Sequence, residues 1–226
     1  KRDVSVSKTW IGPKQDSVQV TLIKDGTPTD QTLTLQEANE WKSSFEDLIK
    51  YDPTDGHEIV YTVQENEISD YSLQMTGDMD NGFVLTNTNT ETLSISVTKS
   101  WIGPVQSQAQ ITLVKDGALT EQTLTLNQEN GWKASFDNLA KYDATDGHKI
   151  EYTIQEAPVE NYTSKITGSM EDGFTVTNTN TETVSIPVEK HWIGPMTDSV
   201  DITLVKDEED TENSLSNEKH VETVVL

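Results

Sequence analysis

A lysine on the apolar face of a predicted strand occurs three times, and this feature most constrains how the chain folds. Each of the three segments alternates polar and apolar residues, which is the pattern of a β-strand with one buried face. The segments are Val4–Trp10, Ile95–Trp101 and Ile186–Trp192. Lys8, Lys99 and Lys190 fall on the apolar faces of their segments. Burying a lone amine is costly, so each lysine requires partner groups from the rest of its domain.

The spacing of these lysines predicts the domain organisation. Successive lysines are 91 residues apart, a period that fits a whole small domain rather than a solenoid repeat. The sequence therefore predicts two complete domains, residues 1–91 and 92–182, and an incomplete third repeat, residues 183–226. After Lys206 the third repeat turns acidic and irregular. We expect it to be poorly ordered beyond its second strand, which leaves Lys190 without a visible partner.

Short alternating segments, punctuated by turn residues, fill both complete copies. Val18–Leu22, Ile59–Glu65 and Phe83–Asn89 are examples from the first copy, and the second copy repeats the order. No segment of helical period is long enough to cover a sheet. The sequence therefore predicts an all-β fold of tandem β-sandwiches. Thr90–Thr92 is the only candidate linker, and its lack of Gly or Ser slack predicts a semi-rigid arrangement in line.

The charge of the chain disfavours two classes of partner. There are 39 acidic and 16 basic residues, a formal net charge of −23. Nucleic acids and anionic membranes both need a basic face on the protein, so we expect neither as a partner. The chain has no cysteine, which excludes disulfides and thiolate metal sites. It has no apolar run of transmembrane length, and its abrupt start in a strand predicts an excised piece of a longer protein.

Each complete copy carries three polar side chains on otherwise apolar strand faces: a lysine, a glutamate and an asparagine. They are Lys8, Glu65 and Asn87 in the first copy, and Lys99, Glu156 and Asn178 in the second. Burying any one of them alone costs several kcal/mol, on the order of the penalty for an unpaired polar group. Burying all three is reasonable if they meet.

Two outcomes follow from such a meeting, and the residues alone leave both open. One is a buried Lys–Glu ion pair with an asparagine bonded beside it, a weak contributor to stability. The other is chemistry. Burial lowers the pKa of an amine and raises that of a carboxylic acid. A neutral amine is a nucleophile, and a protonated carboxyl polarises a carboxamide and moves protons. Attack at contact distance releases ammonia and leaves a Lys–Asn isopeptide bond.

Three motifs surround these residues: a first-strand lysine followed by Trp-Ile-Gly-Pro, a Tyr-Thr-Val/Ile-Gln-Glu strand, and a closing Thr-Asn-Thr strand. Together they resemble the collagen-adhesin B-type (Cna-B) repeat of cell-wall-anchored proteins and pilins of Gram-positive bacteria. The resemblance covers nearly all of residues 1–182 and the start of the third copy. It implies a transthyretin-like or inverse-immunoglobulin sandwich with an intramolecular Lys–Asn bond promoted by a carboxyl residue.

On the matching positions the resemblance assigns a role to each polar residue. Lys8 and Lys99 are the amine donors, Asn87 and Asn178 the acceptors, and Glu65 and Glu156 the promoters. Asn89 and Asn180 lie on the same faces, one pleat further on, and stay open as alternative acceptors. We prefer Asn87 and Asn178 because they directly follow the apolar Leu85 and Val176. Lys190 is expected to stay unreacted.

The resemblance implies a stalk or spacer in an extracellular, cell-wall-anchored adhesin or pilus-like protein. Its expected partners are the neighbouring repeats of the same chain and, through other domains, a host extracellular-matrix or cell-surface ligand. The only expected chemistry is self-directed, so we predict neither a turnover enzyme nor a cofactor. The alternative is a module that itself binds a host protein or glycan.

Other motifs predict structural roles. Asp52–Glu58 offers oxygen ligands near a glycine, but its spacing misses the EF-hand pattern and Lys149 stands where the first copy has Glu58. A polar hairpin loop is predicted there, with no metal. Asn161-Tyr-Thr163 matches a glycosylation sequon, which we expect to be idle in a bacterial protein. The tryptophans recur with the repeat, so we expect them to anchor core or loops.

Overall fold

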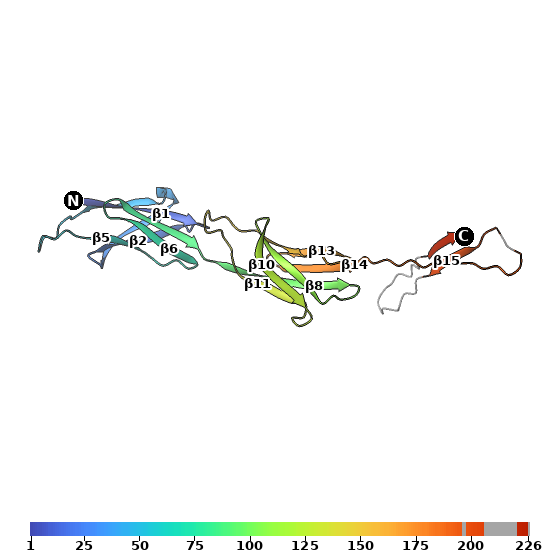
Figure 1. The fold of residues 1–226 in the computed structure, drawn as a ribbon. Coiled ribbons are helices and arrows are strands. Elements are labelled where there is room, and N and C mark those ends of the chain that lie inside the picture. The colour runs from blue at the N-terminus through green and yellow to red at the C-terminus, as the bar shows by residue number, and fades with distance from the viewer. Residues whose placement is uncertain (196–197, 206–220, 226) are drawn as a thin grey trace. The chain divides into compact units, whose positions relative to one another are not determined.

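The computed structural model describes residues 1–195, 198–205 and 221–225, and it divides the chain into two units, residues 1–182 and 183–226. The first unit holds the two complete repeats (Figure 1). The strands of the first repeat are β1 (Arg2–Ile11), β2 (Ser17–Lys24), β3 (Thr27–Gln36), β4 (Lys42–Leu48), β5 (Tyr61–Glu65), β6 (Tyr71–Asp78) and β7 (Gly82–Asn89). A short 3-10 helix, Glu37–Asn39, precedes β4.

The strands of the first repeat form two sheets, one in the order β4-β1-β7-β6 and the other in the order β3-β2-β5. The first and last strands, β1 and β7, are parallel neighbours within one sheet. Apolar side chains from both sheets pack into one core, among them Val6, Leu22, Val63 and Leu85. This is a β-sandwich whose first and last strands lie side by side in the middle of one of its two sheets.

The second repeat has the same architecture. Its strands are β8 (Thr92–Ile102), β9 (Gln108–Lys115), β10 (Ala118–Asn127), β11 (Lys133–Ala140), β12 (Tyr152–Glu156), β13 (Tyr162–Ser169) and β14 (Gly173–Asn180). The sheets are β11-β8-β14-β13 and β10-β9-β12, and β14 is parallel to β8. A second core, which includes Ile95, Leu113 and Val176, lies between them. The prediction of tandem all-β sandwiches is confirmed.

The alternation that predicts the first strand is also observed. Val4, Val6 and Lys8 on β1 are buried, while Ser5 and Thr9 between and after them are exposed. The lysine therefore lies on the core face of the strand in the first repeat, as Lys99 does on β8 in the second.

The third repeat differs from its prediction. Ile186–Trp192 is not a strand, and Lys190 is exposed rather than on a buried face. A strand needs a neighbour to pair with and a face to bury, and the described part of residues 183–226 supplies only β15 (Asp201–Val205) and β16 (Val221–Val225), which pair with each other. Pro187 also removes a backbone donor from that segment.

The expectation of poor order in the third repeat stays a prediction, although the structure has a strand, β16, near its end. This strand lies in a stretch for which the sequence analysis predicts no strand, although its valines have high strand propensity. The rest of that expectation falls on residues 206–220, which lie outside the described residues.

Candidate functional site

In the first repeat three strands bring the predicted polar residues together. Lys8 comes from β1, Asn87 from β7 in the same sheet, and Glu65 from the end of β5 in the facing sheet. Lys8 Nζ donates to Glu65 Oε2 at 2.8 Å and to Oε1 at 3.2 Å. Asn87 Nδ2 donates to the same Oε1 at 2.5 Å. The carboxylate thus joins the amine and the amide nitrogen across the interior of the sandwich.

Burial dominates the electrostatics of this group. The Lys8 side chain is 0% exposed and that of Glu65 is 2% exposed, and Asn87 is buried as well. Loss of hydration lowers the pKa of the Lys8 amine from its ordinary 10.5, against the opposing effect of the hydrogen bond and charge of Glu65. A lowered pKa brings the amine closer to its neutral, nucleophilic form.

The second repeat repeats the group with looser contacts. Lys99 Nζ lies 3.4 Å from Glu156 Oε1, and Asn178 Nδ2 donates to the same oxygen at 3.1 Å. The Lys99 amine also donates to the backbone oxygens of Ser100 at 3.1 Å and Val176 at 3.4 Å. Burial lowers the pKa of Lys99 too, against the charge of Glu156.

The strand register explains why the lysine and asparagine meet. In the β1–β7 pair Lys8 lies opposite Leu85, and Trp10 lies opposite Asn87. Lys8 and Asn87 are therefore diagonal neighbours on the core face, within reach of a long side chain. The second repeat has the same register, with Val176 opposite Lys99 and Asn178 opposite Trp101.

The alternative acceptors do not join these groups. Asn89 is only partly buried, and its Oδ1 accepts the backbone N–H of Glu91 at 2.9 Å. Asn180 Oδ1 accepts the N–H of Glu182 at 2.9 Å in the same way. Both amides lie in turns where the last strand ends. The third lysine, Lys190, has its amine over the ring of Trp192, 4.8 Å from the ring centre.

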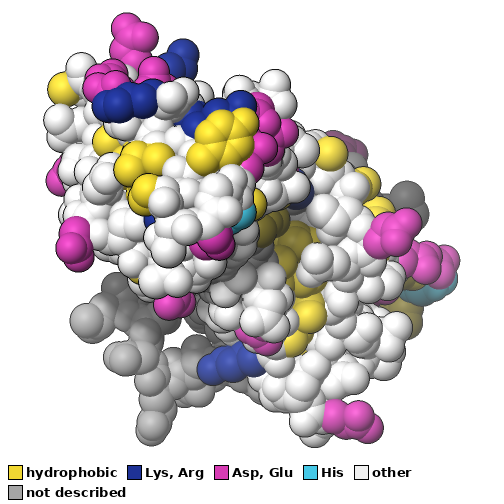
Figure 2. Space-filling view, turned by 90° about the vertical axis from the view of Figure 1, so that its left-hand side faces the viewer, with side chains coloured by type: hydrophobic (Ala, Val, Ile, Leu, Met, Phe, Trp, Pro, Cys, Tyr) yellow, Lys and Arg dark blue, Asp and Glu magenta, His cyan; other side chains and the backbone are white. Residues whose placement is uncertain are grey.

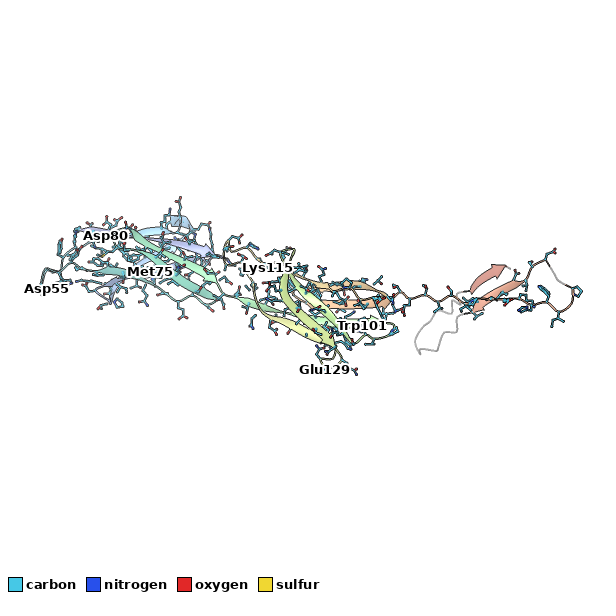
Figure 3. All side chains as sticks on the ribbon, viewed as in Figure 1. Asp55, Met75, Asp80, Trp101, Lys115 and Glu129 are labelled. Atoms are coloured by element: carbon cyan, nitrogen blue, oxygen red, sulfur yellow. The ribbon has the colours of Figure 1, made fainter. Side chains whose placement is uncertain are left out.

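Sequence reasoning did not assign the tryptophan beside each lysine to this site. The Lys8 amine lies 4.6 Å from the centre of the Trp10 ring, and the Lys99 amine lies 4.0 Å from that of Trp101. Trp101, labelled in Figure 3, stands near the end of β8. The two-residue spacing, which places lysine and tryptophan on one strand face, was the available signal.

The predicted hairpin loop is held by charged groups. In the first repeat His57 Nδ1 lies 2.5 Å from Asp55 Oδ1, and its Nε2 lies 3.3 Å from Asp25 Oδ2. In the second repeat Asp143, Asp146 and His148 place ligand atoms within 4.8 Å of one another. Asp143 also pairs with Lys115 at 2.7 Å. These contacts are those of a polar loop, and the absence of a metal stays a prediction.

This loop predicts a pH effect on stability. Asp55 and then Asp25 raise the pKa of His57 above its ordinary 6.5. Because the folded pKa exceeds the unfolded one, the stabilisation is fully present below pH 6.5 and is lost as pH rises through the raised value. We expect Asp55→Asn to lower the pKa of His57 in an NMR titration while His148 in the same chain titrates unchanged. An unchanged His57 titration would contradict this electrostatic account.

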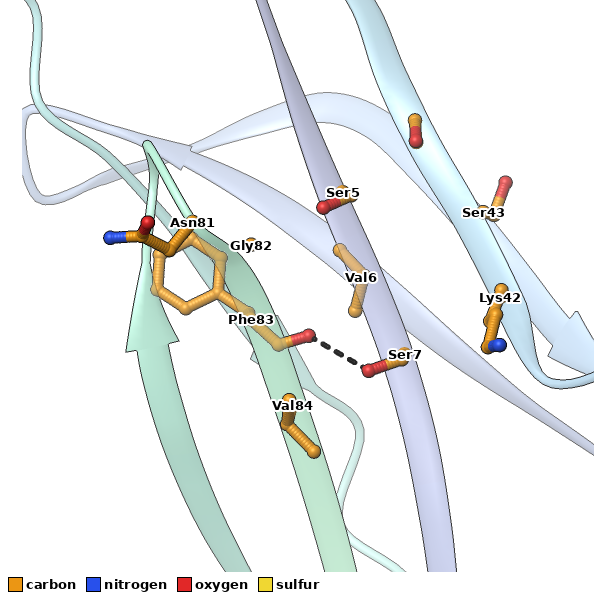
Figure 4. Close-up of a pocket in the computed structure, with 10 residues that line it drawn as sticks. Ser5, Val6, Ser7, Lys42, Ser43, Asn81, Gly82, Phe83 and Val84 are labelled. Carbon is orange, nitrogen blue, oxygen red and sulfur yellow. Dashed lines mark hydrogen bonds between the residues drawn. The ribbon is translucent and has the colours of Figure 1, made fainter.

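A shallow groove of about 370 Å³ lies on the outer face of the first repeat (Figure 4). Its lining includes Ser5 and Ser7 of β1, Lys42 of β4 and Val84 of β7, and Ser7 Oγ donates to the backbone oxygen of Phe83 at 3.4 Å. Small-molecule sites are usually enclosed, whereas this groove is open to solvent and several serines line it. In Figure 2 acidic side chains are spread over the face shown among uncharged ones.

The comparisons with known proteins agree with the repeat structure. The Cna protein B-type domain matches residues 4–88 and residues 95–179. The chain belongs to the Cna protein B-type domain family. Each matched segment contains one complete Lys–Glu–Asn group. No helix among the described residues is long and apolar enough to span a membrane.

Individual proteins are similar to this chain over most of its length. A collagen adhesin of Staphylococcus aureus is 32% identical over 203 residues, which cover 83% of this chain. The match spans only 16% of the length of that relative. The crystal structure of a single B repeat unit of the S. aureus collagen-binding surface protein is 28% identical, with a TM-score of 0.38, and the match covers 80% of this chain and 98% of that one. A shaft pilin of Lactobacillus rhamnosus GG is 13% identical, with a TM-score of 0.31 and coverage of 81% and 99%.

Proposed function

We propose that each of the two repeats closes a Lys–Asn isopeptide bond within itself, and that the chain is a stalk or spacer segment of a Gram-positive surface adhesin or pilus-like protein. The observation that supports the bond is the meeting of an amine, a carboxylate and a carboxamide in a buried site of both repeats. Asn87 and Asn178 are the proposed acceptors because their amides contact the glutamates, whereas those of Asn89 and Asn180 are held in turns.

The chemistry starts from the ion pair of the first repeat. Lys8 passes a proton to the Glu65 carboxylate, 2.8 Å away, and the interior favours this transfer because two neutral groups replace two buried charges. The neutral amine then attacks Cγ of Asn87. Glu65 delivers its proton to Nδ2 and takes the second proton from Nζ, the C–N bond to Nδ2 breaks, and ammonia leaves beside a neutral amide and a protonated Glu65. The product contains no buried charge, which favours the forward reaction.

The surface location rests on the relatives. The collagen-binding surface protein of S. aureus contains B repeat units, and we place this chain in the same kind of protein, outside the cell. The proposed chemistry happens once per repeat and acts on the chain itself, so it is not turnover catalysis and needs no cofactor. Partners of the stalk are the neighbouring repeats, and any host matrix ligand is bound by other parts of the protein.

The intact mass tests the bond directly. We expect the purified chain, under denaturing conditions, to be lighter than its sequence by two molecules of ammonia, because each repeat releases one. Glu65→Ala removes the proton carrier of the first repeat, so we expect it to restore one ammonia. Glu156→Ala is the matched variant in the second repeat, and the double variant should have the full sequence mass.

Peptide mapping assigns each loss to its residues. We expect a cross-linked peptide that joins Lys8 to Asn87. A peptide that joins Lys8 to Asn89 would show that Asn89 is the acceptor instead. A wild-type mass equal to the sequence value would remove the covalent mechanism and leave two buried polar clusters.

The alternative function, binding of a host protein or glycan by these repeats, has weaker support. A ligand-binding copy is expected to carry a distinctive loop insertion, and the two complete copies keep one 91-residue interval between their first-strand lysines. A solid-phase screen of the chain against matrix proteins and glycans separates the two functions, because a spacer binds none of them.

A further inference from the structure

Five buried polar atoms at the two sites have no hydrogen-bond partner among the described residues; apart from Glu156 Oε2, they form one donor–acceptor pair in each repeat. In the first repeat the pair is Trp10 Nε1 and Asn87 Oδ1, and in the second it is Trp101 Nε1 and Asn178 Oδ1. A buried group without a partner costs about 1–3 kcal/mol and needs an explanation. In each repeat the two atoms are complementary, because the indole N–H donates and the amide oxygen accepts.

The strand register places these residues beside each other. Trp10 lies directly opposite Asn87 in the β1–β7 pair, and Trp101 lies directly opposite Asn178 in the β8–β14 pair. Residues paired in this way project their side chains from the same face of the sheet. The Trp10 ring also lies against the Lys8 amine, 4.6 Å from the ring centre. One tryptophan therefore contacts the amine and adjoins the amide that the amine would attack.

Neighbouring groups hold each of these rings in place. Trp10 makes edge-to-face contacts with Trp41 at 5.4 Å and with Tyr71 at 5.3 Å. The Tyr71 hydroxyl donates to the backbone oxygen of Pro13, in the loop that follows β1. The second repeat has the same arrangement around Trp101. A ring fixed on two sides is suited to act on a reaction without reorganising.

We propose that Trp10 and Trp101 act in the Lys–Asn reaction: the indole face seats the amine, and the indole N–H donates to the asparagine Oδ1 as that oxygen becomes negative. This inference rests on the isopeptide bond proposed above. It gives a reason for the unpartnered pair in each repeat, which is kept for a hydrogen bond made in the transition state.

Glu65 leaves this role open to another donor. Its Oε1 accepts hydrogen bonds from both Lys8 Nζ and Asn87 Nδ2. The carboxylate therefore contacts the nitrogen of the Asn87 amide. When Nζ bonds to Cγ, the carbonyl π-electron pair moves to Oδ1. When the bond from Cγ to Nδ2 breaks, that pair returns to the carbonyl, ammonia leaves with the proton from Glu65, and Glu65 takes the second proton from Nζ. A donor aimed at the developing charge is most effective in a dry site, and such bonds often tighten only in the transition state.

The test follows bond formation in newly made chains. The full chain is synthesised in a cell-free reaction and quenched in acid at set times, and mass mapping then gives the bonded fraction of each repeat. Trp10→Phe keeps an aromatic face for the amine but loses the N–H, together with part of the volume of the indole ring. We expect this variant to slow bond formation in the first repeat by on the order of a hundredfold, which is the effect of removing one oxyanion donor. The second repeat of the same chain should keep its wild-type rate.

Trp41→Phe is the matched control. Trp41 also has a buried, unpartnered indole N–H and packs against Trp10, but it precedes β4, which pairs with β1 and not with β7. Because phenylalanine keeps an aromatic ring against Trp10, we expect this variant to form the bond within a fewfold of the wild-type rate. Thermal unfolding of both tryptophan variants in a Glu65→Ala background, where no bond forms, measures their effects on packing.

The outcomes separate the two proposals. A wild-type rate in Trp10→Phe, or equal slowing by Trp10→Phe and Trp41→Phe, overturns the role of the indole N–H while the isopeptide bond stands. A wild-type chain that loses no ammonia overturns both. If Trp10→Phe prevents folding of the first repeat, Trp101→Phe provides the same test in the second repeat. Slower bond formation there supports the role of the indole N–H, and an unchanged rate overturns it.

Discussion

Pulled by its two ends, the wild-type chain is expected to resist extension of both complete repeats, whereas Asn87→Ala is expected to add one long unfolding step. The proposed bond joins β1 to β7, the strands through which force enters and leaves the first repeat. Force would then pass from Lys8 directly to Asn87 and bypass the roughly 80 residues between them. Those residues span at most about 280 Å when extended, so the variant should gain a step of up to that length.

Single-molecule force spectroscopy on the full chain measures this step. Asn178→Ala is the matched variant and should release one step of similar length from the second repeat. The double variant should release two. Steps of this length in the wild-type chain, at forces that unfold ordinary sandwiches, would contradict a covalent clamp between the terminal strands.

The polar residues of the site were predictable because the buried face of a strand can be recognised from the two-residue alternation in its sequence. Lys8, Glu65 and Asn87 each occupy an alternating position among apolar residues, and all three are buried. That they converge is a property of the sheet order, in which β1 pairs with β7 and faces β5. Two-residue periodicity contains no information on which strands become neighbours.

Other features depend on neighbours and were missed or wrong. The edge strand β6 is exposed along most of its length, so burial leaves no pattern in its sequence. Ile186–Trp192 has the pattern of a first strand and is not one, because no strand pairs with it among the described residues. The role inferred for Trp10 depends on its register with Asn87, which appears only once the sheet is built.

Loss of Glu65 is expected to destabilise the first repeat far more than loss of the bond alone. Without the bond, the closed loop of roughly 80 residues no longer restricts the unfolded chain, a loss of about 4–5 kcal/mol. Glu65→Ala also leaves the Lys8 ammonium buried without its counter-ion, which costs about 3–5 kcal/mol. For a domain of this size each kcal/mol lowers Tm by about 4–8 °C. We therefore expect Tm of the first repeat, measured by calorimetry, to fall by several tens of degrees.

A charge-free variant separates the two contributions. Lys8→Met combined with Glu65→Leu also prevents the bond but buries no charge, so we expect it to recover the part of the stability loss that comes from the unpaired charge, about 3–5 kcal/mol.

The pH dependence of stability separates the two contributions in a second way. In Glu65→Ala the pKa of Lys8, already lowered by burial, loses the opposing effect of the carboxylate. The folded state then binds fewer protons than the unfolded state, so stability should rise as pH increases toward 10.5. The charge-free variant lacks this group and should show no such rise, and equal slopes in the two variants would mean that the Lys8 amine is not the buried charge responsible.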